Sequence, residues 1–120
     1  MPKLILVEDD KTMLSLLTTL LMMEGFELAN CDLGSEEKIL EGIRQVQPDL
    51  VLLDVNLHQA NGLEVLRKLR VDPEIAAVRI LMSSGMDFRR ECLAAGANGF
   101  IMKPYMPDDL ITHIRKTLTT

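Results

Sequence analysis

Apolar and polar positions follow two alternating patterns along the chain. Short unbroken apolar runs predict buried strands, and apolar residues spaced three or four positions apart predict helices with one buried face. The predicted strands span residues 3–7, 26–30, 50–53, 78–82 and 99–102, and the second is weaker than the first. The predicted helices begin at residues 10, 35, 61, 86 and 107 or 108, of which the short helix at 86–95 has the weakest pattern. Five alternating strands and helices predict an α/β fold, with helices on both faces of a five-stranded parallel sheet.

Turn and cap residues mark several boundaries between these elements. Gly25 ends the first helix, and Ser35 with the acidic pair Glu36 and Glu37 suits the positive N-terminal end of the second. No linker, internal repeat or low-complexity stretch divides the sequence. Because 120 residues lie within the usual size of one domain, we expect a single domain over residues 1–120.

The composition argues against several function classes. The net charge is −5, aromatic residues make up 3% and Trp is absent, which disfavours direct nucleic-acid binding through bulk positive charge or stacked bases. A helix-turn-helix module does not fit in the chain, so a DNA-binding output would have to lie beyond it. Neither a signal peptide nor an apolar stretch of about 20 residues occurs, so we expect a cytoplasmic protein without membrane insertion.

Cysteine and methionine usage adds two smaller expectations. Cys31 and Cys92 lie far apart and outside any CxxC or Cys/His cluster, so we expect free, buried thiols rather than a zinc site or a disulfide. The eight methionines are interpreted as core-filling residues, with an adaptable partner surface as the alternative.

Chemically active side chains follow four of the five predicted strands. They are Glu8, Asp9 and Asp10 after the first strand, Asp54 after the third, Ser83 and Ser84 after the fourth, and Lys103 after the fifth. In parallel sheets, ligands bind at the edge where these carboxyl ends meet. Clustered carboxylates favour a bound cation, and Mg²⁺ suits a few carboxylates with water and phosphate oxygens. Since an Asp can accept a phosphoryl group that Lys and Mg²⁺ neutralise, the strand ends predict phosphoryl chemistry.

These residues and their spacing resemble the receiver domain of two-component response regulators. The supporting stretches are Pro-Asp-Leu-Val-Leu-Leu-Asp at 48–54, Asn-Gly-Leu-Glu at 61–64 and Gly-Ala-Asn-Gly-Phe-Ile-Met-Lys-Pro at 96–104. Each motif alone is weak, but together and in this order they are highly specific, and the resemblance covers essentially the whole chain. It implies a flavodoxin-like (βα)5 fold with strand order 2-1-3-4-5, as in the bacterial chemotaxis member of the family.

The resemblance also implies a role for each side chain of the acidic site. Asp54 corresponds to the phosphoacceptor, Asp9 to a direct Mg²⁺ ligand and Glu8 to a ligand acting through water. The backbone carbonyl of Asn56 corresponds to a further metal ligand, and Lys103 to the lysine that contacts the phosphoryl group. Mg²⁺ is the expected ion, with Mn²⁺ as a possible substitute.

Two further residues correspond to the switch of the family. Ser83 matches the hydroxyl that binds a phosphoryl oxygen, with its neighbour Ser84 as the competing choice. Phe100 matches the aromatic residue that turns inward when that hydroxyl moves, which alters the surface formed by the fourth helix, the fifth strand and the last helix. By the same analogy, the peptide bond between Lys103 and Pro104 is expected to be cis.

Two positions leave alternatives open. Glu8 and Asp9 are preferred as the acidic pair because the strand then ends after Val7, whereas Asp10 is favoured as a helix cap; the other register pairs Asp9 with Asp10. His58 stands where the family often has Pro, and we favour an exposed loop histidine over a contact with the phosphate.

The implied function is phosphorelay signalling. A sensor histidine kinase or a histidine phosphotransfer protein would supply the phosphoryl group, and the chain would catalyse its own phosphoryl transfer and slow autodephosphorylation without being a conventional enzyme. The alternative is a phosphorylation-independent interaction module, which would be expected to lack the acceptor, the acidic pair or the lysine. A flavin protein is a third possibility, but the acidic residues 8–10 would repel its phosphate.

Overall fold

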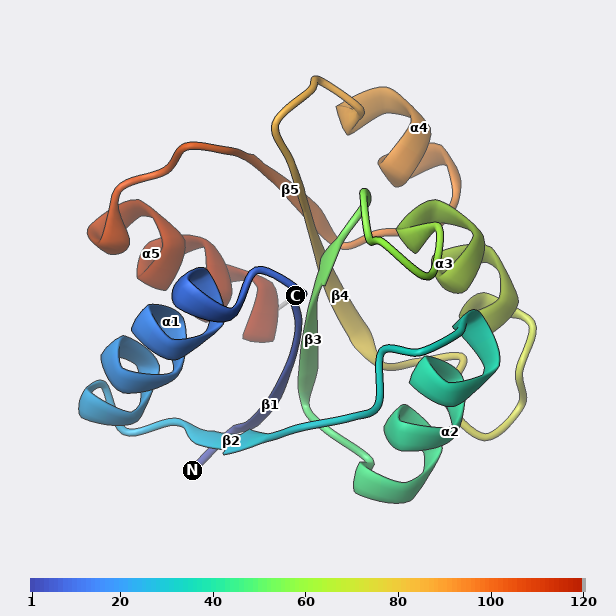
Figure 1. Ribbon diagram of the computed structural model, residues 1–120, viewed down its shortest axis with the longest axis horizontal. Coiled ribbons are helices and arrows are strands. Elements are labelled where there is room, and N and C mark those ends of the chain that lie inside the picture. The colour runs from blue at the N-terminus through green and yellow to red at the C-terminus, as the bar shows by residue number, and fades with distance from the viewer. Residues whose placement is uncertain (120) are drawn as a thin grey trace.

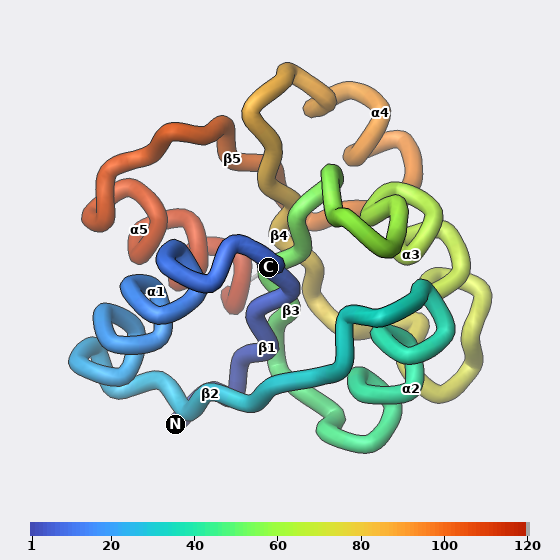
Figure 2. Tube along the Cα trace, viewed as in Figure 1, coloured from blue at the N-terminus to red at the C-terminus, as the bar shows by residue number. Residues whose placement is uncertain are grey.

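Five short strands form one parallel sheet in the computed structural model, which describes residues 1–119. The strands are β1 (Lys3–Val7), β2 (Glu27–Ala29), β3 (Leu50–Asp54), β4 (Arg79–Ser84) and β5 (Gly99–Met102). Their order is β2-β1-β3-β4-β5, so the expected 2-1-3-4-5 arrangement is confirmed. The tube in Figure 2 shows β1, β3 and β4 near the centre of the molecule, with the helices around them.

The helices cover the sheet on both sides (Figure 1). One side holds α1 (Lys11–Met23) and α5 (Pro107–Leu118), and the other holds α2 (Glu36–Val46), α3 (Gly62–Arg70) and α4 (Arg89–Ala94). Each side has its own apolar cluster, because alternate strand residues point to opposite faces. Among residues 1–119, no helix has the length and apolar character that crossing a membrane requires.

Side chains cap the N-termini of three helices near the edge of the sheet where the carboxyl ends of the strands meet. Asp10 accepts a hydrogen bond from the Met13 N–H at 3.1 Å and begins α1. Ser35 and Asn61 cap α2 and α3 in the same way. The helix-cap role favoured for Asp10 is therefore confirmed, and β1 ends at Val7 as the preferred register requires.

The fourth strand and fourth helix differ from the sequence prediction. Strand β4 continues to Ser84, two residues beyond the predicted end, because Ser83 and Ser84 pair with Ile101 and Met102 of β5. Both serines are polar, so the apolar run ends before them and a prediction based on apolar residues misses this extension of the strand. Helix α4 is shorter than the predicted 86–95, and its cap residue Phe88 makes no side-chain hydrogen bond to it.

The core-filling interpretation of the methionines is wrong for most of them. Met82 is fully buried in β4. Six others have large exposed fractions: Met1, Met22, Met23, Met86, Met102 and Met106. The leucines, isoleucines and valines of the strands and helices fill the core instead.

Both cysteines are free thiols, as expected. Cys92 is buried, whereas Cys31 is only partly buried. Burial raises the pKa of each thiol to about 11, so both remain protonated and weakly nucleophilic near neutral pH.

Candidate functional site

Lys103 joins two buried carboxylates at the carboxyl edge of the sheet. Its Nζ donates to Glu8 Oε1 at 2.6 Å and to Asp54 Oδ2 at 2.8 Å. Glu8 is 5% exposed and Asp54 is 6% exposed, so both depend on a positive partner. Burial alone lowers the pKa of Lys103, but the two carboxylates raise it to about 12, and the ammonium is charged at neutral pH.

The backbone places Asp54 at the end of β3. The Val55 N–H donates to the Ser83 carbonyl at 2.9 Å, and the Gly62 N–H donates to the Val55 carbonyl at 2.8 Å. A Cβ on Gly62 would lie 2.0 Å from the Asp54 carbonyl oxygen, so only glycine lets α3 begin this close to the acceptor strand. The Asn56 N–H donates to Asp54 Oδ1 at 3.2 Å and orients the carboxylate.

The two adjacent serines of β4 have different surroundings. Ser83 is opposite Asp54 in the strand register, so both side chains emerge on the same face of the sheet. Ser84 is fully buried; its Oγ donates to Asn56 Oδ1 at 3.2 Å and accepts from the Met86 N–H at 3.1 Å. Ser84 therefore links the loop after β3 to the loop after β4.

Asp9 contacts the loop after β3 through His58. The His58 backbone N–H donates to Asp9 Oδ2 at 2.6 Å, and His58 Nδ1 lies 3.2 Å from the same oxygen. The imidazole is 83% exposed, as expected for a loop histidine, but the backbone contact was not predicted. The sequence contained one clue, since any residue other than Pro at position 58 has an N–H to donate.

The aromatic ring of Phe100 faces the interior of the protein. Phe100 is 2% exposed and belongs to the apolar cluster on the α2–α4 side of the sheet. The Arg89 guanidinium lies 5.6 Å from the ring centroid, which is within the range of a cation–π contact. The ring therefore connects β5 directly to the first turn of α4.

Tyr105 is a further residue near the site that sequence reasoning missed. Its hydroxyl is buried and has no hydrogen-bond partner among the described residues. Burial raises the pKa of Tyr105, while the charged Lys103 opposes that shift. The peptide bond between Lys103 and Pro104, just before Tyr105, is cis as expected.

The oxygen donors at this edge suit a hard divalent cation. Within residues 1–119, no three His, Cys, Asp or Glu side chains lie together as a preformed metal cage. Mg²⁺ does not need one, because it usually keeps several waters and uses one or two carboxylates. The carboxylates of Asp9 and Asp54, with the Asn56 carbonyl, are donors of this kind and fit Mg²⁺; nothing in this donor set favours Mn²⁺.

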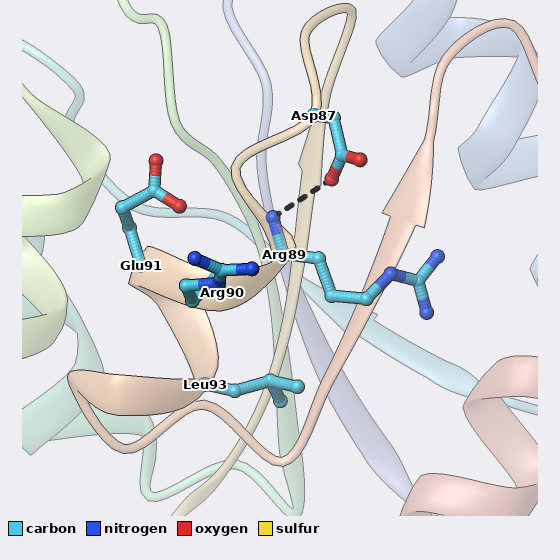
Figure 3. Close-up of a pocket in the computed structure, with 5 residues that line it drawn as sticks. All are labelled: Asp87, Arg89, Arg90, Glu91 and Leu93. Atoms are coloured by element: carbon cyan, nitrogen blue, oxygen red, sulfur yellow. Dashed lines mark hydrogen bonds between the residues drawn. The ribbon is translucent and has the colours of Figure 1, made fainter.

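A separate hollow lies beside α4 (Figure 3). Five residues line it: Asp87, Arg89, Arg90, Glu91 and Leu93. The Arg89 N–H donates to Asp87 Oδ1 at 3.2 Å, and the Arg89 side chain extends away from this pair. None of the five is a sequence-predicted site residue, and the hollow has no place in the chemistry of the acidic edge.

Comparison with known proteins identifies relatives over nearly the whole chain. Residues 4–115 match the model of the response regulator receiver domain family. The DNA-binding response regulator MtrA of Mycobacterium tuberculosis (strain ATCC 25618 / H37Rv) is 34% identical over 116 residues, which cover 97% of this chain and 50% of MtrA. The chain therefore spans about half the length of the curated relatives it matches.

Solved structures share the fold. A response regulator receiver domain protein (CheY-like) from Methanospirillum hungatei JF-1 has a TM-score of 0.85 and 28% identity, with 99% of this chain and 94% of that chain covered. The receiver domain of the sensor histidine kinase PA1611 from Pseudomonas aeruginosa PAO1, with a magnesium ion coordinated in its active site cleft, has a TM-score of 0.85. Its identity is 20%, and the match covers 99% of this chain and 98% of that chain.

Proposed function

This chain belongs to the response regulator receiver domain family, which acts in two-component phosphorelay signalling, and we propose from that premise that it accepts a phosphoryl group on Asp54. Residues 1–120 would form one receiver domain. The observation that carries the proposal is the position of Lys103, whose ammonium lies within hydrogen-bonding distance of both Asp54 and Glu8 at the carboxyl edge of the sheet.

The proposed donor is a phosphohistidine on a sensor histidine kinase or a histidine phosphotransfer protein. One Asp54 carboxylate oxygen attacks the phosphorus, so an O–P bond forms while the N–P bond breaks. The electron pair of the broken bond stays on the leaving imidazole nitrogen. Lys103 and the Ser83 hydroxyl receive the negative phosphoryl oxygens. Slow hydrolysis by water returns the Asp54 carboxylate and releases inorganic phosphate.

Mg²⁺ is the proposed cofactor. Asp9, Asp54 and the Asn56 carbonyl would hold it directly, and Glu8 would hold it through water. When bound, the ion supplies positive charge that offsets the charge on the phosphoryl oxygens. The acidic donor set and the magnesium described for the PA1611 receiver domain support this choice.

The proposed output is a change in the surface formed by α4, β5 and α5. Ser83 would move toward a phosphoryl oxygen and shift its β5 partner Ile101, which is the chain neighbour of Phe100. The contact between Phe100 and Arg89 supports this route, because it extends from β5 to α4. The ring is already buried without a phosphoryl group, so the proposed change involves its neighbours on α4 rather than an inward rotation of the ring.

Intact mass spectrometry tests the proposal. The chain is incubated briefly with an acyl phosphate and Mg²⁺, alongside Asp54→Asn and a magnesium-free control. We expect the gain of one phosphoryl group only in the wild type with Mg²⁺. If no gain is seen, a titration with beryllofluoride, which mimics the phosphoryl group, distinguishes rapid hydrolysis of the aspartyl phosphate from a site that does not bind a phosphoryl group. Failure to bind that analogue as well would favour a phosphorylation-independent interaction module.

A further inference from the structure

The loop between β3 and α3 reaches the loop after β1 through His58. The His58 N–H lies 2.6 Å from Asp9 Oδ2, and Nδ1 of the same residue lies 3.2 Å from that oxygen. The Asp9 side chain is only 20% exposed, so this oxygen has limited access to water. The His58 N–H therefore occupies one oxygen of the carboxylate, with Nδ1 close to it, and neither contact involves the other oxygen, Oδ1.

The loop that presents this N–H is closed on itself. Asn56 and Asn61 form an antiparallel bridge across its base, and the Gly62 N–H donates to the Val55 carbonyl at 2.8 Å. Asn61 also caps α3. The position of the His58 N–H is thus set by backbone contacts on both sides of the loop, and it does not depend on the exposed imidazole.

We propose that His58 is a positioning residue for divalent-cation binding, because its backbone N–H holds the Asp9 carboxylate by Oδ2 and leaves Oδ1 for the cation. This inference rests on the proposed function, in which Asp9 is a Mg²⁺ ligand. A carboxylate that is already oriented loses less side-chain freedom when it binds an ion. Hydrogen-bond partners of metal ligands typically contribute 10–100-fold to metal affinity. The imidazole, at 83% exposure, contributes little because water screens its interaction.

Isothermal titration calorimetry with Mg²⁺ on three forms of the chain separates the N–H from the imidazole. His58→Ala keeps the N–H, and we expect its Mg²⁺ affinity to stay within about twofold of the wild type. His58→Pro removes the N–H, and we expect its affinity to fall roughly tenfold or more. Equal or tighter Mg²⁺ binding by His58→Pro overturns the positioning role while leaving the proposed function intact. A wild type that does not bind Mg²⁺ overturns both.

A measurement on the amide itself keeps the inference testable if His58→Pro does not fold. In the ¹⁵N–¹H NMR spectrum without added metal, a short hydrogen bond to a carboxylate should move the His58 amide proton downfield and slow its exchange with solvent. Asp9→Ala removes the acceptor, so we expect the resonance to move upfield and exchange to accelerate. An unchanged His58 amide in Asp9→Ala overturns the inference without reference to metal binding or phosphorylation.

Discussion

The ammonium of Lys103 lies 2.8 Å from the carboxylate of Asp54, although 49 residues separate them in the chain. Strands β3 and β5 are not neighbours, since β4 lies between them. The long Lys103 side chain therefore reaches across the carboxyl end of β4. This arrangement brings the proposed acceptor and its positive partner together before any phosphoryl group arrives.

Removal of this ammonium should destabilise the fold. In Lys103→Met, Glu8 and Asp54 remain buried without their positive partner, and we expect the free energy of unfolding to fall by about 3 kcal/mol. Added Mg²⁺, or Asp54→Asn in the same background, should recover part of the loss. Urea denaturation followed by circular dichroism measures this. Lys38→Met is the matched control, because its ion pair with Asp32 is exposed and should contribute under about 1 kcal/mol. Equal stability of the two variants would contradict the structural interpretation.

The stabilisation by Lys103 should persist from neutral pH into the alkaline range and then disappear. The folded-state pKa of Lys103 is raised from 10.5 to about 12, so its interactions stabilise the fold fully below the unfolded pKa. They are lost as the pH rises through the folded value. We therefore expect the difference in unfolding free energy between the wild type and Lys103→Met to be constant from neutral pH to about 10 and to shrink above it. If the difference in unfolding free energy shrinks near pH 8 instead, a titrating group other than Lys103 controls it.

Substitutions at the two adjacent serines should have different effects, one on the stability of the fold and the other on the binding of a phosphoryl analogue. Ser84→Ala breaks the contacts to Asn56 and Met86, and we expect a loss of about 1–2 kcal/mol in unfolding free energy, with beryllofluoride affinity within about threefold of the wild type. Ser83→Ala removes the proposed phosphoryl contact, and we expect roughly tenfold weaker beryllofluoride binding. Denaturation and a fluoride-analogue titration of both variants test this. The reverse assignment of the two effects would make Ser84 the switch hydroxyl.

Gly62 should tolerate no side chain. An added Cβ would lie 2.0 Å from the Asp54 carbonyl oxygen and 2.8 Å from Val55 Cα, and neither backbone atom can move without shifting β3. We expect Gly62→Ala to lower the unfolding free energy by about 3 kcal/mol or more and to abolish phosphorylation. Gly85→Ala is the control for stability, since its added Cβ would meet nothing within 4 Å. A thermal unfolding midpoint for Gly62→Ala equal to that of Gly85→Ala would show that the helix start can shift.

Most strand ends were predictable to within one residue, because the apolar run of a buried strand stops where a charged or polar side chain appears. Val7 is followed by Glu8, and the apolar run of β3 is followed by Asp54. This rule fails at β4, because Ser83 and Ser84 look like a loop in an apolar pattern but pair within the sheet. Element order and the position of the acidic edge therefore follow from residue types, whereas this boundary depends on pairing between strands.

The sequence predicted which residues form the site better than it predicted the contacts between them. The sequence brings Glu8, Asp54 and Lys103 to one edge, but it does not show that one ammonium serves both carboxylates. The link from His58 to Asp9 uses a backbone N–H, which every residue except Pro carries and which no side-chain pattern reveals. Loop geometry decides such contacts, and that geometry depends on tertiary packing.

Borohydride reduction of the phosphorylated chain tests the central claim most directly. The reagent converts an aspartyl phosphate to homoserine, and peptide mass spectrometry then identifies the position. After phosphorylation with Mg²⁺ present, we predict homoserine at position 54 and at no other position, with none formed in Asp54→Asn. Homoserine at position 9 or 10, or a stable phosphoryl group on His58 or a serine, would contradict the account.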